Sequence, residues 1–250
     1  MPKAVMFDCY NTLLRYQSEE DKKGIWKILL NSIGYVTEQK FTVTPKKLKV
    51  MYQKACEREE EECKKCRGEY AEVSLRRVWE NVLKELGISP EMANAKAEDI
   101  LLLHRLYARK QCFLFKNVKE ELLKLKKQGM KLLLLSNAQT CFIYNELPEE
   151  IRKLFDVVLI SEIVGIKKPS EEVFQLAFEK LGVKPEEVVF VGDSAEDDMI
   201  PTGKLGCHCI MIGEQIKKDD KISHVIEFNP YKESGYEGLS DIIVSLNREK

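Results

Sequence analysis

Long apolar stretches are missing from this sequence of 250 residues. The longest, around residues 132–135, is far shorter than the roughly 20 residues that a membrane-spanning helix requires. Residues 1–7 contain one lysine and lead directly into a charged motif, which leaves no room for the apolar region of a signal peptide. We therefore expect a protein of the cytoplasm that has no membrane partner.

An excess of charge of one sign is also missing, because 40 Lys and Arg residues almost balance 41 Asp and Glu residues. This balance removes the electrostatic argument for a nucleic acid as a partner. Hydrophobic residues make up 44% of the chain and charged residues 32%, a composition typical of globular proteins and not of disordered ones. A small-molecule substrate remains the expected partner, and both a monomer and a homodimer fit the composition.

Histidine is scarce, and the eight cysteines do not follow the spacing of a zinc site. Cys63 and Cys66 form a CxxC pair, but a zinc site needs a second ligand pair, which Cys207 and Cys209 do not supply at the usual distance. Without a secretion signal, eight cysteines in a chain of this length indicate reduced thiols and not a disulfide framework. We interpret Cys63 and Cys66 as one turn of a charged helix.

Short β-rich runs alternate with amphipathic segments, which is the pattern of βα units around a parallel sheet. The sequence predicts strands at residues 4–7, 131–135, 157–160, 188–191 and 209–212, and a weaker one at 225–228. Helices are predicted at residues 118–128 and 171–181, and each ends at a glycine of the kind that often terminates helices. The expected fold class is α/β, with a Rossmann-like parallel sheet.

One block breaks this alternation, because residues 17–112 show helical periodicity and no convincing strand. Within it, helices are predicted at residues 48–67, 73–86 and 90–110. We therefore divide the chain into a Rossmann-like catalytic core, residues 1–16 and 113–250, and an all-helical cap domain, residues 17–112, inserted after the first strand. A cap of this kind would exclude water from an active site and select substrates.

Four short segments carry polar residues of the types that perform catalysis. In chain order they contain Asp8 and Tyr10, then Ser136 and Asn137, then Lys168, and finally Asp193, Asp197 and Asp198. Catalytic groups of an open parallel sheet gather beyond the carboxyl ends of its strands. Since most of these segments follow predicted strands, we expect their side chains to converge.

Each segment alone has a plainer structural explanation. Asp8 would cap a turn after a strand, and Ser136 would cap the helix that follows it. Lys168 would be a surface lysine before a proline, and one of Asp197 and Asp198 would only favour the dipole at a helix N-terminus. All four segments in this order, however, favour a shared catalytic site.

The order and spacing of the four segments resemble the four motifs of the haloacid dehalogenase superfamily of hydrolases, over all of the chain except the helical block. The resemblance implies that the carboxylate of Asp8 is a nucleophile that attacks phosphorus or carbon and forms an aspartyl ester. It also implies that Ser136 and Asn137 form hydrogen bonds to the transferring group. Lys168 would supply a positive charge to the same group.

Carboxylates that converge on Asp8 repel one another unless a cation lies between them. Ligand sets made only of oxygen atoms favour Mg²⁺. The resemblance implies that Asp8, the main-chain carbonyl of Tyr10 and Asp193 bind Mg²⁺ directly. Asp198 would support the ion, with Asp197 as the alternative at that position.

Tyr10 departs from the pattern of the phosphatases in this family, which usually have a second Asp here as the general acid. A positioned acid contributes about 10² to 10⁴ in rate, and a tyrosine with a pKa of about 10 is a poor replacement. The Asp-x-Tyr pattern resembles the 2-haloacid dehalogenases, whose halide leaves without a proton. Those enzymes use no metal, however, and typically have a small polar residue in place of Asp193. A milder departure is Asn11, which replaces a Gly and tolerates a positive φ.

Three functions follow, and the leading one is a Mg²⁺-dependent phosphatase that acts on a small phosphorylated metabolite through an aspartyl phosphate. Because Tyr10 replaces the acid, this enzyme would prefer leaving groups that depart easily, such as aryl or acyl phosphates. The alternative is a 2-haloacid dehalogenase that uses Asp8 without a metal. A third reading is a catalytically weak binding or regulatory protein of the same fold.

Overall fold

The computed structural model describes residues 2–20, 22–214 and 225–246. The chain divides into two compact units. We call residues 1–16 and 112–250 the sheet unit, and residues 17–111 the helical unit. Among the described helices, none combines the length and the apolar character needed to traverse a bilayer.

The core strands confirm the predicted pattern, each within one residue at its ends. The strands are β1 (Ala4–Phe7), β2 (Leu14–Ser18), β3 (Arg109–Leu114), β4 (Lys131–Ser136), β5 (Val157–Ile160), β6 (Val188–Gly192), β7 (His208–Ile212) and β8 (Ile226–Phe228). The helices are α1 (Ile25–Thr37), α2 (Pro45–Arg67), α3 (Leu75–Glu85), α4 (Pro90–Ala108), α5 (Val118–Lys127), α6 (Thr140–Glu146), α7 (Glu149–Arg152), α8 (Ser161–Val164), α9 (Glu171–Leu181), α10 (Ile200–Lys204) and α11 (Leu239–Ser245). Two short helical turns are η1 (Pro185–Glu187) and η2 (Ala195–Met199).

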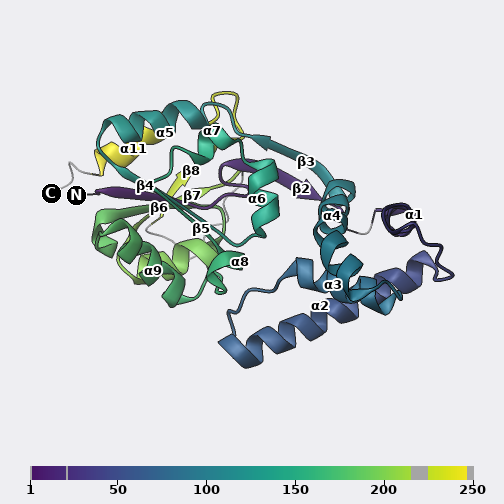
Figure 1. Ribbon diagram of the computed structural model, residues 1–250. Helices are drawn as coiled ribbons and strands as arrows, with labels where there is room; N and C mark the ends of the chain where they lie inside the picture. The colour runs from purple at the N-terminus through teal and green to yellow at the C-terminus, as the bar shows by residue number, and fades with distance from the viewer. Residues whose placement is uncertain (1, 21, 215–224, 247–250) are drawn as a thin grey trace. The chain divides into compact units, whose positions relative to one another are not determined.

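Six strands of the sheet unit form one parallel sheet in the order β5-β4-β1-β6-β7-β8, which confirms the α/β Rossmann-like class. Helices α5 and α11 cover one face of this sheet and α9 covers the other (Figure 1). Strand β1 lies between β4 and β6, with Phe7 level with Leu134 on one side and Val191 on the other. The residues that follow these three strands therefore emerge together at one edge of the sheet.

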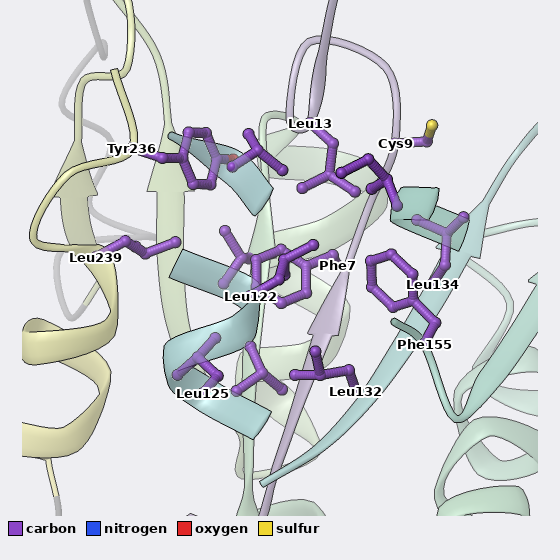
Figure 2. Packing of buried hydrophobic residues seen from close by; sticks show 14 of the residues in the cluster. Phe7, Cys9, Leu13, Leu122, Leu125, Leu132, Leu134, Phe155, Tyr236 and Leu239 are labelled. Atoms are coloured by element: carbon purple, nitrogen blue, oxygen red, sulfur yellow. The ribbon is translucent and has the colours of Figure 1, made fainter. Parts of the chain in front are cut away.

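Both faces of β1 are buried, so its side chains alternate between two apolar clusters. On one face, Phe7 and Leu134 pack with Leu122 of α5 (Figure 2). On the other face, Met6 belongs to a cluster with Phe174 of α9. A strand enclosed in this way has a fixed register, because a slip of one residue would exchange the two faces.

The predicted absence of strands between residues 17 and 112 is wrong at both ends of that block. Strands β2 and β3 form a separate two-stranded sheet. The main-chain N–H of Phe115 donates to the carbonyl of Leu13 over 3.0 Å, and the N–H of Glu19 donates to the carbonyl of Ala108 over 2.8 Å, so the strands run in opposite directions. Both strands are mostly half-buried or exposed, which explains why hydrophobic periodicity did not indicate them.

The helical unit begins three of its helices with a hydroxyl side chain. Thr44, Ser74 and Ser89 each accept a hydrogen bond from the main-chain N–H three residues later, at the starts of α2, α3 and α4. Cys63 and Cys66 lie one turn apart in α2, as predicted. All eight cysteines belong to the described chain, and none of them is placed in a disulfide bond.

Tyr236 connects the C-terminal segment to the loop that follows β1. Its side chain is fully buried, and its hydroxyl donates to the carbonyl of Thr12 over 2.6 Å. In the same loop Asn11 has a φ of 57°, and its Oδ1 accepts the main-chain N–H of Tyr16 over 3.1 Å. The loop after β1 is therefore fixed both by its own hydrogen bonds and by a residue distant in the sequence.

We expect Tyr236→Phe to lower the free energy of unfolding by about 1–2 kcal/mol, because the carbonyl of Thr12 loses its partner while the ring is kept. Urea denaturation followed by circular dichroism measures this change. The matched control is Tyr35→Phe in α1, where the side chain is 86% exposed and a change within about 0.5 kcal/mol is expected. Equal losses in the two variants would contradict a specific role for the buried hydroxyl.

Candidate active site

Asp8 lies at the carboxyl edge of the sheet, directly after β1. Its main-chain N–H donates to the carbonyl of Val191 over 2.9 Å, so pairing with β6 continues to this residue. Only 7% of Asp8 is exposed. Ser136 ends β4 and Asp193 follows β6 at the same edge. The sheet thus brings together three of the four predicted segments by its topology alone.

Lys168 is buried between two carboxylates. Its Nζ lies 2.7 Å from Oδ1 of Asp8 and 2.7 Å from Oδ1 of Asp198, and 3% of the residue is exposed. Burial alone would lower the pKa of Lys168, but attraction to Asp198 and Asp8 outweighs it and places the pKa above its usual value. The alternative of an exposed surface lysine is therefore excluded, and the side chain carries a positive charge.

Asn137 holds the main chain of Lys168 in place. Its Oδ1 accepts the N–H of Lys168 over 2.8 Å, and its Nδ2 donates to the carbonyl of Lys168 over 3.0 Å. Nδ2 carries a second hydrogen, so these two bonds leave a donor that could reach the transferring group, and that role of Asn137 stays a prediction. The two bonds fix the main chain of Lys168 relative to the end of β4.

Ser136 is 1% exposed, and its Oγ has no hydrogen-bond partner within the described part of the chain. The alternative of a helix cap does not hold for Ser136, because the residue that precedes α6 is Gln139. A buried hydroxyl without a partner is costly and calls for an explanation. A hydrogen bond to a bound substrate at the carboxyl edge of β4 would supply one.

Three carboxylates crowd around this point. Asp8, Asp193 and Asp198 each offer an oxygen atom, and these atoms lie within 4.8 Å of one another. Burial, followed by repulsion from Asp8 and Asp198, raises the pKa of Asp193 to about 8. Burial, with repulsion from Asp8 and against the attraction of Lys168, raises the pKa of Asp198 to about 6. The negative charges therefore exceed what one ammonium group can offset.

Asp198, and not Asp197, joins this cluster. The main-chain N–H of Ser194 donates to Oδ2 of Asp198 over 3.1 Å. A Cβ atom at Gly192 would overlap the side chain of Asp198, so the glycine allows this close approach. Asp197 is half-buried, burial raises its pKa, and its main-chain N–H donates to Oγ of Ser194 over 3.0 Å.

A divalent cation that prefers oxygen ligands fits the donor set of Asp8, Asp193 and Asp198. Three carboxylates are hard ligands, and the two positive charges of such an ion would offset the repulsion that Lys168 leaves. The role of the Tyr10 carbonyl as a further ligand stays a prediction.

Glu146 is a site residue that the sequence did not indicate. The hydroxyl of Tyr10 donates to Oε2 of Glu146, the last residue of α6, over 2.7 Å. The ring of Tyr10 also contacts that of Tyr16, with centroids 5.3 Å apart. No motif links positions 136 residues apart, so only the fold reveals this pair. The hydroxyl proton of Tyr10 is thus directed toward the carboxylate of Glu146. In this position Tyr10 acts as a hydrogen-bond donor to Glu146 and does not offer its proton to a leaving group.

Comparisons with known proteins agree with this geometry. A family model described as haloacid dehalogenase-like hydrolase matches residues 2–201. A glyceraldehyde 3-phosphate phosphatase of Methanocaldococcus jannaschii is 31% identical over 129 residues, which are 51% of this chain and 55% of that protein. A phosphoserine phosphatase of Thermus thermophilus is 30% identical over 145 residues, 58% of this chain and 56% of that protein. The matched part thus spans about half the length of these relatives.

A crystal structure of a 2-haloacid dehalogenase from Pseudomonas syringae pv. Tomato matches with a TM-score of 0.70, covering 98% of this chain and 100% of that one. The sequence identity is 21%, so this likeness shows the fold alone. The stretch from Asp8 to Asp198 falls inside the residues matched by the family model. The chain belongs to the haloacid dehalogenase-like hydrolases.

Proposed function

We propose that this protein is a Mg²⁺-dependent phosphatase that hydrolyses a small phosphorylated metabolite through an aspartyl-phosphate intermediate. The observation that carries the proposal is the ammonium group of Lys168, 2.7 Å from the carboxylates of Asp8 and Asp198 with Asp193 in the same cluster. Concentrated positive charge beside a carboxylate nucleophile suits transfer of a dianionic phosphoryl group. The phosphatase names of two relatives support the same reaction.

The nucleophile is held for attack by its contact with Lys168. Because Lys168 engages Oδ1 of Asp8, the second oxygen of the carboxylate remains for phosphorus. A bond from Asp8 to phosphorus forms as the bond to the leaving oxygen breaks, and that oxygen keeps the electron pair and takes a proton from water. A second water then attacks phosphorus, which restores the carboxylate and releases inorganic phosphate. Lys168 and the hydroxyl of Ser136 would bind the phosphoryl oxygens.

Asp8, Asp193 and Asp198 are the side chains that would hold Mg²⁺, together with the main-chain carbonyl of Tyr10. When bound, the ion would neutralise phosphoryl charge and orient the phosphate toward the nucleophile. We assign the role of a cap domain, which selects substrates, to the helical unit.

Tyr10 favours a second candidate, a 2-haloacid dehalogenase, because a departing halide needs no proton. Against it stands the cluster around Asp8: a haloacid is an anion, and Asp193 and Asp198 would repel it. We therefore expect no chloride release from 2-chloropropionate in the presence of a chelator. Steady release measured by a chloride electrode would favour the dehalogenase.

Asp8→Asn is expected to lower turnover of p-nitrophenyl phosphate with Mg²⁺ by at least about 10³-fold, because an amide cannot serve as the nucleophile. Steady-state kinetics measure the loss. The comparison variant is Asp197→Asn, whose side chain lies outside the carboxylate cluster and whose loss should stay below about tenfold. Full activity in Asp8→Asn would overturn the proposed mechanism.

Asp193→Asn is expected to abolish the stabilisation of the protein by Mg²⁺. Saturating Mg²⁺ should raise the Tm of the wild type by about 5 °C, since an ion that binds only the folded state stabilises it. The variant in chelator should melt no lower than the wild type, because the substitution removes a carboxylate from a repulsive cluster. Differential scanning fluorimetry with Mg²⁺ and with EDTA decides between these outcomes. An equal Mg²⁺ shift in both proteins would contradict the site.

Aryl phosphates are expected to turn over about 10²-fold faster than alkyl phosphates, because the hydroxyl of Tyr10 is committed to Glu146 and no carboxylic acid occupies its position. The measurement compares kcat for phenyl phosphate and ethyl phosphate with Mg²⁺. Tyr10→Asp should narrow the gap by restoring an acid. Equal turnover of the two substrates by the wild type would refute the leaving-group argument.

A further inference from the structure

Arg15 lies over an aromatic ring in the sheet unit, close in sequence to the nucleophile. Its guanidinium carbon is 5.0 Å from the ring centroid of Tyr231. The ring of Tyr231 is supported in turn by Phe115, with centroids 5.0 Å apart at 76°. Stacking on an aromatic face fixes the plane of a guanidinium group and leaves its N–H donors directed outward in that plane.

These donors find no acceptor within the described part of the chain. The side chain of Arg15 forms no ion pair or hydrogen bond there, and its Nε is buried without a partner. A second arginine on a tyrosine shows the contrast: Arg152 lies 4.6 Å over Tyr144, but its Nη1 donates to main-chain carbonyls at the end of α6, including that of Tyr144 over 3.1 Å. Arg152 therefore has a structural role, whereas the charge of Arg15 has no anionic partner among residues 2–20, 22–214 and 225–246.

The position of Arg15 relates it to the candidate active site. Tyr10 and Leu14 form an isolated β-bridge, and the N–H of Asn11 donates to the carbonyl of Leu14 over 2.5 Å, so Arg15 follows directly on the loop that carries Asp8. The charge of Asp193 in the candidate active site also acts on Tyr231. Burial raises its pKa, and the charge of Asp193 raises it further, while Arg15 lowers it.

We propose that Arg15, held on Tyr231, binds a carboxylate of the substrate and so selects phosphomonoesters that carry one. A guanidinium edge offers paired N–H donors that match the two oxygens of a carboxylate. This assignment rests on the proposed phosphatase function and adds the substrate class to it. The phosphoryl group is bound around Lys168, and the second anionic group of the same molecule is bound at Arg15.

The test uses two pairs of substrates that differ only by a carboxylate or its neutral amide. The short pair is 2-phosphoglycolate and 2-phosphoglycolamide, and the long pair is 4-carboxyphenyl phosphate and 4-carbamoylphenyl phosphate. In at least one pair, wild-type kcat/KM with Mg²⁺ should favour the carboxylate by about tenfold, the size expected for one charge-assisted hydrogen-bonded pair. Arg15→Gln should reduce that ratio to about one, and Arg15→Lys should keep part of it. Arg152→Gln, the matched control, should keep the full ratio.

Calorimetric binding of the same pairs to Asp8→Asn separates this proposal from the proposed function. A preference for the carboxylate that disappears in Asp8→Asn/Arg15→Gln supports the role of Arg15, even where the wild type shows no turnover. If the wild type hydrolyses none of these substrates but still binds the carboxylate more tightly than the amide, the result contradicts only the proposed phosphatase function. No preference for either carboxylate, in binding and in turnover, overturns the role of Arg15, as does a preference that survives Arg15→Gln.

Discussion

Electrostatic crowding at the carboxyl edge of the sheet is the constraint on which the rest of the site depends. Oxygen atoms of three carboxylates lie within 4.8 Å of one another, and one buried ammonium group contacts two of these carboxylates. Such an arrangement persists only where the surrounding chain is rigid enough to resist repulsion. The two apolar clusters that enclose β1 supply this rigidity, and the reciprocal pair between Asn137 and the main chain of Lys168 adds to it.

Most of the sheet was predictable from the sequence because buried parallel strands form short, continuous apolar runs. The same reasoning anticipated that Asp8, Ser136 and Asp193 would meet, since each follows or ends a strand of that sheet. Strands β2 and β3 escaped prediction because they are stabilised by pairing with each other, and their residues are only partly buried. Hydrophobic periodicity reflects which side chains are buried, so it does not indicate a pair of strands whose side chains are mostly exposed or half-buried.

The sequence also did not predict which side chains distant in the chain would contact each other. The bond between Tyr10 and Glu146 joins a loop to the end of a helix, and neither residue belongs to a pattern that names the other. The sequence also left open whether Asp197 or Asp198 joins the carboxylate cluster. The two residues are adjacent on an irregular turn, and only the direction of each side chain distinguishes them. Hydrogen bonding from Ser194 and the space beside Gly192 settle which of the two carboxylates enters the cluster.

The two-stranded sheet of β2 and β3 makes the helical unit an insertion whose two ends lie side by side. The chain leaves the sheet unit along one strand and returns along its neighbour, so the entry and exit points of about a hundred residues are adjacent. If the segment between β2 and β3 were replaced, the sheet unit would still be joined to the new segment through the same two paired strands. The helical unit can therefore be exchanged for a segment of different length while Asp8, Lys168 and Asp198, which all belong to the sheet unit, keep their supporting strands.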